Sequence, residues 1–175
     1  MYIQTERLIL RNARPVDANA YHTLWNTPSV QKFNVMQPPS LERAMEAVER
    51  DSGSERVLYI QLKDGAHMIG QIQFDDDDLR YDTGSCNVSY SLMEAYAGNG
   101  YMTEALTAAI DYAFRELGVQ MVASRVFREN AKSHRVLEKL GFVKEGVLRR
   151  AVKGLDGTVF DDVVYSMTKD EYEAR

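Results

Sequence analysis

A glycine-bearing turn at residues 98–100 is the part of the sequence best suited to hold an anion. Gly98 and Gly100 flank Asn99, and a strongly helical pattern begins at Tyr101. Glycine adopts left-handed backbone conformations at little steric cost, so such a turn can direct several N–H groups to one side. The start of the helix adds unpaired N–H donors and the positive end of its dipole. The segment therefore predicts a cradle for a diphosphate group.

Two common nucleotide-binding motifs do not fit this turn. Residues 98–105 lack the glycine-lysine-serine/threonine step of a Walker loop, and no third glycine follows Gly100 at the spacing of the dinucleotide fingerprint. A turn with two glycines also closes many strand-to-helix connections that bind nothing. Taken alone, the turn is compatible with either interpretation.

Two polar residues lie at the start of a short amphipathic helix that is predicted at residues 130–140. Asn130 and Ser133 lie one helical turn apart, so they share a face. The spacing is equally typical of an asparagine that caps the helix and of a serine that faces solvent. From spacing alone the pair has no assigned chemistry.

The remaining reactive side chains favour structural roles. Cys86 is expected to be a small buried strand residue, because no activating pattern surrounds it. His22, His67 and His134 are expected on the surface, and none has a second ligand at zinc spacing. The acidic run at residues 75–78 lacks the interleaved spacing of a calcium loop and is interpreted as a solvated loop. We therefore predict no metal site.

The elements that position these residues follow from hydrophobic periodicity and turn signals. A helix is expected to begin near Pro15 and Asp17, and another to run over residues 40–51 with Ser40 as its cap. Further helices are predicted at residues 101–117 and 130–140. Strands are predicted at residues 5–11, 57–62, 68–74, 85–92, 121–126, 142–151 and 159–167. This order predicts an α/β fold, a mixed sheet covered by helices, in one domain spanning residues 1–175.

Composition and net charge indicate which classes of protein the chain can belong to. The chain has 175 residues, of which 45% are hydrophobic and 27% charged, as expected for a globular domain with a packed core. Its net charge of −5 argues against a nonspecific nucleic-acid binder and mildly favours a cationic substrate. No segment resembles a signal peptide or a membrane span. We expect a cytoplasmic protein with no membrane or nucleic-acid partner.

Two blocks of sequence resemble the GCN5-related N-acetyltransferases, in particular the branch of ribosomal-protein N-terminal acetyltransferases. Residues 98–105 are similar to that branch's coenzyme A diphosphate loop, and residues 130–146 carry its asparagine, serine and closing glycine pattern. Residues 5–8 and 162–167 add weaker similarity near the two ends. One departure is Ala95, which stands where the wider family often has glutamine or arginine. Backbone N–H groups supply most phosphate contacts, so this change need not abolish binding.

The resemblance implies a mostly antiparallel, seven-stranded sheet with a central V-shaped splay and about four helices. The strands at residues 89–93 and 121–126 would diverge at the splay, so that the pantetheine arm of acetyl-coenzyme A pairs with a free strand edge. An N–H group within residues 90–92 would polarise the thioester carbonyl. The coenzyme-binding residues that the resemblance implies are Ser91, Leu92, Met93, Gly98, Asn99, Gly100, Tyr101, Met102, Thr103, Asn130, Lys132, Ser133 and Arg135.

Catalytic roles follow only in part from the resemblance. Ser133 resembles the hydroxyl that protonates the departing thiolate, and therefore is expected to act as the general acid. An acceptor amine must lose a proton, yet the position where some relatives carry a glutamate is close to Val152. The general base is therefore unassigned, and a water-mediated base is one option. The candidate bases are Glu55, Asp161, Asp162 and Tyr165.

The resemblance implies an acceptor amine, which belongs to a peptide or protein N-terminus or to a small molecule such as a polyamine or aminoglycoside. Trp25, Phe33 and the prolines at 38 and 39 are candidates for the acceptor side, although aromatic residues more often pack in a core or lid. The absence of an assigned base also leaves open a module that senses acyl-coenzyme A without catalysis. The sequence leaves open a monomer or a homodimer.

Overall fold

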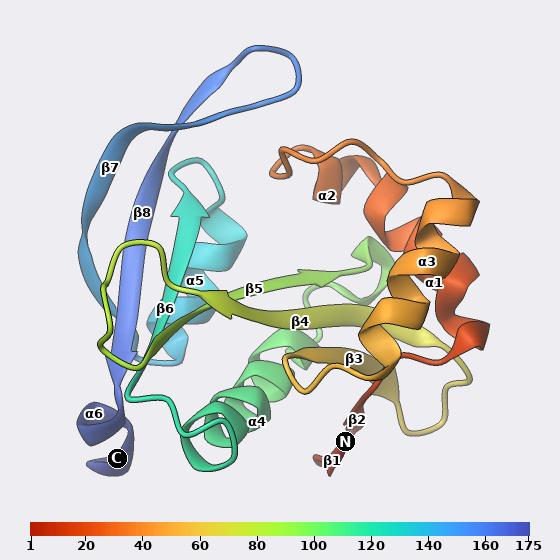
Figure 1. Ribbon diagram of the computed structural model, residues 1–175, viewed down its shortest axis with the longest axis horizontal. Coiled ribbons are helices and arrows are strands. Elements are labelled where there is room, and N and C mark those ends of the chain that lie inside the picture. The colour runs from red at the N-terminus through yellow and green to blue at the C-terminus, as the bar shows by residue number, and fades with distance from the viewer. The chain divides into compact units, whose positions relative to one another are not determined.

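A computed structural model describes residues 1–175 and contains one eight-stranded sheet (Figure 1). The strands follow the order β1-β2-β3-β4-β5-β6-β8-β7. The chain divides into two compact units, residues 1–73 with 90–109 and residues 74–89 with 110–175. Each unit is described by itself below. None of the helices combines the length and the apolar character needed to cross a bilayer.

The first unit contains the amino-terminal strands and the helices that pack on them. Its strands are β1 (Tyr2–Gln4), β2 (Leu8–Arg11), β3 (Val57–Leu62), most of β4 (Met68–Asp76) and the end of β5 (Ser85–Leu92). Its helices are α1 (Ala18–Asn26), α2 (Pro28–Gln31), α3 (Leu41–Ser52) and the start of α4 (Tyr101–Arg115), with 3-10 turns η1 (Pro15–Asp17) and η2 (Glu94–Tyr96). Strands β1 to β4 pair in sequence as antiparallel neighbours.

A hydrophobic cluster joins α1 and α3 to strands β3 and β4 within this unit. Leu24 of α1 and Val48 of α3 are almost fully buried with Tyr59 of β3 and Met68 of β4. Burial of large apolar side chains at about 1.5–3 kcal/mol each is the main stabilisation of such a layer. Ser40 accepts a hydrogen bond from Arg43 N at 3.3 Å and so caps α3, as the sequence predicts.

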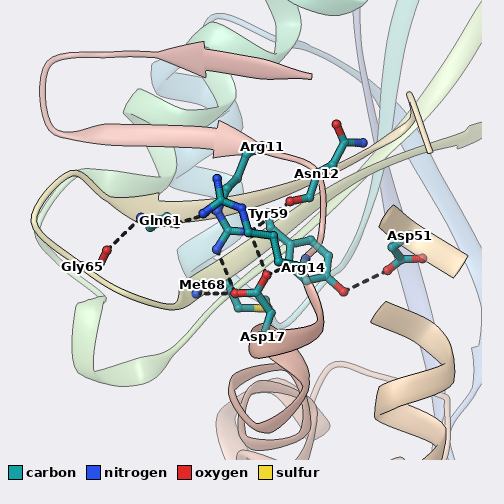
Figure 2. A network of polar contacts seen from close by, with 9 residues as sticks. All are labelled: Arg11, Asn12, Arg14, Asp17, Asp51, Tyr59, Gln61, Gly65 and Met68. Carbon is teal, nitrogen blue, oxygen red and sulfur yellow. Dashed lines mark hydrogen bonds and ion pairs between the residues drawn. The ribbon is translucent and has the colours of Figure 1, made fainter. Parts of the chain in front are cut away.

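A buried ion pair lies beside this cluster (Figure 2). Both guanidinium Nη atoms of Arg11 reach the Asp17 carboxylate, at 2.7 and 2.8 Å. Gln61 accepts a further hydrogen bond from Arg11 Nε at 2.5 Å. In the same view Tyr59 donates its hydroxyl to Asp51 at 3.1 Å. These bonds tie β2, the start of α1, β3 and the end of α3 together.

The second unit contains the carboxyl-terminal half of the chain. Its own elements are β6 (Met121–Phe127), α5 (Ala131–Lys139), β7 (Val143–Lys153), β8 (Val159–Thr168) and α6 (Lys169–Glu173). Strand β8 pairs antiparallel with both β6 and β7, while β5 and β6 pair in parallel. The aromatic rings of Phe127 and Phe160 stack with centroids 4.9 Å apart.

The parallel pairing of β5 with β6 is short. It extends from Ser85 opposite Met121 to Asn87 opposite Ala123, although β6 continues to Phe127. Just beyond the last pair, the Ser124 hydroxyl donates to the Val88 carbonyl at 3.0 Å. The backbone ladder therefore ends near the position at which the sequence predicts the two strands to diverge.

Most predicted elements are confirmed, but three expectations are corrected. The sheet has eight strands rather than seven, because β1 before Thr5 was not predicted. The predicted strand 5–11 is also shorter, since the chain turns at Thr5, whose N–H donates to the Leu8 carbonyl at 3.0 Å, and β2 begins at Leu8. The short helices α2 and α6 raise the helix count above four. The acidic run is not uniformly solvated, since Asp77 is buried and pairs with Arg80 at 2.6 Å. Cys86 is buried in β5, as expected.

Candidate functional site

The turn at residues 98–100 has the backbone conformation that its glycines predict. Gly98 and Gly100 have φ values of 81° and 80°, in the left-handed region. The Asn99 side-chain amide donates to the carbonyls of Tyr96 and Ala97 at 3.2 and 3.3 Å, which closes the turn locally. A Cβ on Gly98 would meet no heavy atom within 4 Å, so one side of the turn is open. The open side fits a cradle for an anion.

Helix α4 begins directly after the turn. Its first backbone hydrogen bond runs from Glu104 N to Gly100 O at 3.0 Å. The N–H groups of Tyr101, Met102 and Thr103 precede this bond and lack intrahelical partners, so they are available to an anion. The Met102 side chain is buried in the core, and only its backbone can serve a ligand. The predicted role of these three residues therefore rests on their N–H groups.

The end of β5 supplies the predicted strand edge. Ser91, Leu92 and Met93 are half-buried. The Met93 N–H donates to the Ile69 carbonyl at 2.9 Å and is therefore already used within the chain. A Cβ on Gly70 would lie 2.6 Å from the Ser91 carbonyl, so this close approach requires glycine. Within this segment, Ser91 and Leu92 are the better candidates for pairing with an extended ligand.

Sequence reasoning missed a group of residues that contacts this turn from the β1–β2 connection. The Glu104 carboxylate accepts hydrogen bonds from Thr5 Oγ1 at 2.6 Å, from Arg7 N at 2.8 Å and from Arg7 Nε at 2.7 Å. These partners are separated by 97 to 99 residues along the chain. No local spacing could reveal the contact, although Thr5, Arg7 and Glu104 all fall within the blocks that carry the family resemblance.

In the second unit, Asn130 and Ser133 meet at the start of α5. Asn130 is the N-cap, and its Oδ1 accepts from Ser133 N at 3.3 Å. The cap uses Oδ1 and not the amide Nδ2, so it does not prevent the side chain from donating to a ligand. Ser133 is half-buried, whereas Lys132 and Arg135 are exposed. Capping and ligand contact are therefore compatible at Asn130.

His134 is half-buried, as is His22, whereas His67 is exposed. The Nδ1 of His134 lies 2.9 Å from the Tyr165 hydroxyl and its Nε2 lies 3.2 Å from the Arg128 carbonyl oxygen. Tyr165 also donates to Glu138 at 3.2 Å. Burial, followed by the Glu138 carboxylate, raises the pKa of the Tyr165 phenol. Tyr165 is therefore protonated at neutral pH and is a poor general base.

The remaining candidate bases differ in how their oxygens are used. Hydrogen bonds from the Arg150 N–H and then from Arg128 lower the pKa of Asp161, which weakens it as a proton acceptor. Asp162 is buried and pairs with Arg125 at 2.8 Å, but its Oδ1 is buried without a hydrogen-bond partner. Glu55 is exposed in the first unit. Among these carboxylates, Asp162 is the one with a buried oxygen, Oδ1, that accepts no hydrogen bond.

The expected acceptor residues are placed in the first unit. Trp25 is half-buried beside Tyr21, with ring centroids 5.9 Å apart, and its Nε1 is buried without a hydrogen-bond partner. Phe33 is half-buried and Pro38 exposed. The Pro39 carbonyl accepts from the Asn26 side chain at 3.0 Å. Trp25 thus belongs to α1, whereas Phe33, Pro38 and Pro39 lie between α2 and α3.

Comparison with known proteins identifies the family. A model of the acetyltransferase (GNAT) domain matches residues 7–143. The uncharacterized N-acetyltransferase YoaA of Bacillus subtilis is 30% identical over 173 residues, which cover 95% of this chain and 96% of that protein. The ribosomal protein uS5 alanine N-acetyltransferase of Escherichia coli is 31% identical over 109 residues, or 62% of this chain and 55% of the enzyme.

Solved structures share the fold. A GNAT-family acetyltransferase from Bacillus anthracis superposes with a TM-score of 0.87 at 23% identity, covering 98% of this chain and all of the other. RimJ of Mycobacterium smegmatis, solved in complex with a coenzyme A disulfide, gives a TM-score of 0.78 at 22% identity over 94% of this chain and 83% of its own. From the domain match and the full-length relative, the chain belongs to the GNAT acetyltransferase family and is an N-acetyltransferase.

Proposed function

We propose that the chain transfers the acetyl group of acetyl-coenzyme A to the primary amine of a peptide or protein N-terminus. The observation that carries this proposal is the pair of left-handed glycines, Gly98 and Gly100, directly before the N-terminus of α4. Left-handed glycines and free helix N–H groups are the arrangement that binds a diphosphate. The coenzyme carries such a diphosphate between its nucleotide and its pantetheine arm.

The residues of each unit have separate tasks in this proposal. In the first unit, the N–H groups of Gly98, Gly100 and the first turn of α4 hold the diphosphate, and Ser91 and Leu92 pair with the pantetheine amides. In the second unit, Asn130 donates a hydrogen bond from its side-chain amide to the coenzyme arm. As the acceptor nitrogen bonds to the carbonyl carbon and the carbon–sulfur bond breaks, Ser133 Oγ gives a proton to the thiolate. The proton that the nitrogen loses passes to water, and Ser133 regains its own proton from solvent.

Two observations support a peptide acceptor. The Escherichia coli relative is named for an alanine of ribosomal protein uS5, which is a protein acceptor. In addition, the segment between α2 and the middle of α3 exposes apolar side chains, which suit a peptide better than a polyamine. These are Val35, Met36, Leu41 and Met45.

A steady-state assay of thiol release with acetyl-coenzyme A tests the acceptor class. The panel contains a peptide that begins with alanine, the same peptide with a blocked amino terminus, spermidine and an aminoglycoside. We expect release with the free peptide and none with the blocked one. Faster release with spermidine or the aminoglycoside would replace the peptide by a small-molecule amine. Tight coenzyme binding with no release from any acceptor would contradict catalysis and favour a sensor.

Replacing Gly98 with alanine should weaken coenzyme A binding about tenfold. A side chain at a φ of 81° costs roughly 1–2 kcal/mol, so the turn is expected to leave the conformation that directs its N–H groups to the ligand. The Cβ would also enter the open side of the turn. Isothermal calorimetry with coenzyme A measures the dissociation constant.

Gly157 provides a matched control for this substitution. It also has a left-handed φ, 86°, and a Cβ there would likewise meet nothing within 4 Å, but it lies in the β7–β8 connection. Gly157→Ala should cost similar stability in thermal unfolding and leave coenzyme A binding unchanged. Equal loss of binding in both variants would show that the effect of Gly98→Ala is general destabilisation.

A further inference from the structure

Arg7 lies between an acidic residue and the predicted diphosphate turn. On one side, its backbone N–H and its Nε bind the Glu104 carboxylate at 2.8 and 2.7 Å. On the other, its Nη1 donates to the Asn99 carbonyl at 3.0 Å. The guanidinium carbon lies 4.6 Å from the centroid of the Tyr101 ring. One side chain thus contacts both the turn and the first turn of α4.

These contacts also reach the second glycine of the turn. A Cβ on Gly100 would lie 3.4 Å from Arg7 Nη2. The other hydrogen bonds of Asn99 go from its side-chain amide to the nearby carbonyls of Tyr96 and Ala97. Arg7 is therefore the residue that joins the turn to the β1–β2 connection.

The charge of Glu104 makes this arrangement unusual for an anion site. A carboxylate in the first turn of a helix is favourable for the helix dipole but repels a second anion at the same end. Burial alone would raise the pKa of Glu104, yet hydrogen bonds from Thr5 and from Arg7 hold the pKa below its usual value. Glu104 is therefore ionised at neutral pH. Only 16% of its side chain is exposed, so water screens its charge poorly.

We propose that Arg7 is a positioning residue for the coenzyme: it offsets the charge of Glu104 and fixes the turn through Asn99 and Tyr101, so that the diphosphate can bind. This inference rests on the proposed coenzyme site. Glu104 in turn orients Arg7 through two hydrogen bonds, while Thr5 holds the carboxylate at 2.6 Å. Arg7 acts through the turn rather than on the reacting atoms.

Calorimetry with coenzyme A and steady-state kinetics with acetyl-coenzyme A test the proposal on the full chain. Arg7→Gln exposes the turn to the Glu104 charge, and we expect the dissociation constant and KM to rise about tenfold with little change in kcat. Glu104→Gln keeps an acceptor for Thr5 and should weaken binding less than Arg7→Gln, because it removes the repelling charge together with the ion pair that orients Arg7. The double variant should recover to within about threefold, because the repelling charge is gone.

Three results would overturn the proposal: unchanged affinity in Arg7→Gln, no recovery in the double variant, or a loss of kcat rather than a rise in KM. S-acetylpantetheine, which lacks the diphosphate, gives an independent readout, since Arg7→Gln should not change its kcat/KM. Arg115→Gln removes another ion pair of α4, to Asp111 at 2.7 Å, and should leave coenzyme affinity unchanged. Failure of the unchanged chain to bind coenzyme A would instead reject the proposed function itself.

Discussion

Replacing Ser133 with alanine is expected to lower kcat by about 100-fold or more while coenzyme A binds as before. Protonation of the departing sulfur favours loss of the thiol over loss of the amine from the tetrahedral intermediate, and a positioned general acid contributes roughly 10²–10⁴-fold to such a step. Ser133 is half-buried at the start of α5, where its N–H binds the side chain of Asn130. Because the cap uses the backbone of Ser133, alanine retains it. Stopped-flow measurement of thiol release, together with calorimetry, separates chemistry from binding.

Ser52 offers a control serine at the end of another helix. It is exposed and donates only to the Glu49 carbonyl, at 2.7 Å. Ser52→Ala should leave both kcat and coenzyme affinity unchanged. If Ser133→Ala kept full turnover, the hydroxyl would not be the general acid, and a water molecule would have to protonate the thiolate.

Replacing Asp17 with alanine should lower the free energy of unfolding by about 3–5 kcal/mol, the usual cost of leaving a buried ion without its partner. Asp17 is fully buried, and Arg11 is 1% exposed. The carboxylate also accepts the backbone N–H groups of Arg14 at 2.9 Å and Met68 at 3.2 Å (Figure 2). Urea denaturation measures the loss. Glu173→Ala, which removes an exposed ion pair 3.9 Å long with Lys169, should change stability by less than about 1 kcal/mol.

The contribution of Asp17 should also depend on pH. Burial on its own would raise the pKa of Asp17, but the hydrogen bonds from Arg11 and from Arg14 N outweigh it and hold the pKa below its usual value. A lowered folded pKa means that the stabilisation is complete above the unfolded pKa of about 4 and is lost as the pH falls through the folded value. The difference between the unchanged chain and Asp17→Ala should therefore shrink below about pH 4. A difference that grew in acid would contradict this assignment.

Local sequence patterns were sufficient for most of the fold. The helix α4 follows from its apolar period and ends before Gly118, whose φ of 69° is that of a helix-ending glycine. The turn of Gly98 and Gly100 followed from the conformational freedom of glycine. One local signal was overlooked: Thr168 and Glu171 form a capping box, spaced as such boxes are, and they begin α6.

The parts that could not be predicted depend on contacts between distant segments. The turn at residues 5–7, which separates β1 from β2, coincides with the bonds that Thr5 and Arg7 make to Glu104, far along the chain. The partial burial of His134 depends on Tyr165 of β8. Neither set of contacts produces a hydrophobic period or a local motif that could be recognised in the sequence. Two further expectations also depend on how distant segments meet: one domain over residues 1–175, and the residue that acts as the general base. Both stay predictions.

Isothermal calorimetry of the full chain with coenzyme A tests the diphosphate site most directly. We expect saturable binding of one coenzyme per chain, about tenfold weaker in Gly98→Ala and unchanged in Gly157→Ala. Absence of binding heat with the unchanged chain at several temperatures, or equal affinity in all three proteins, would show that the turn before α4 does not hold the coenzyme.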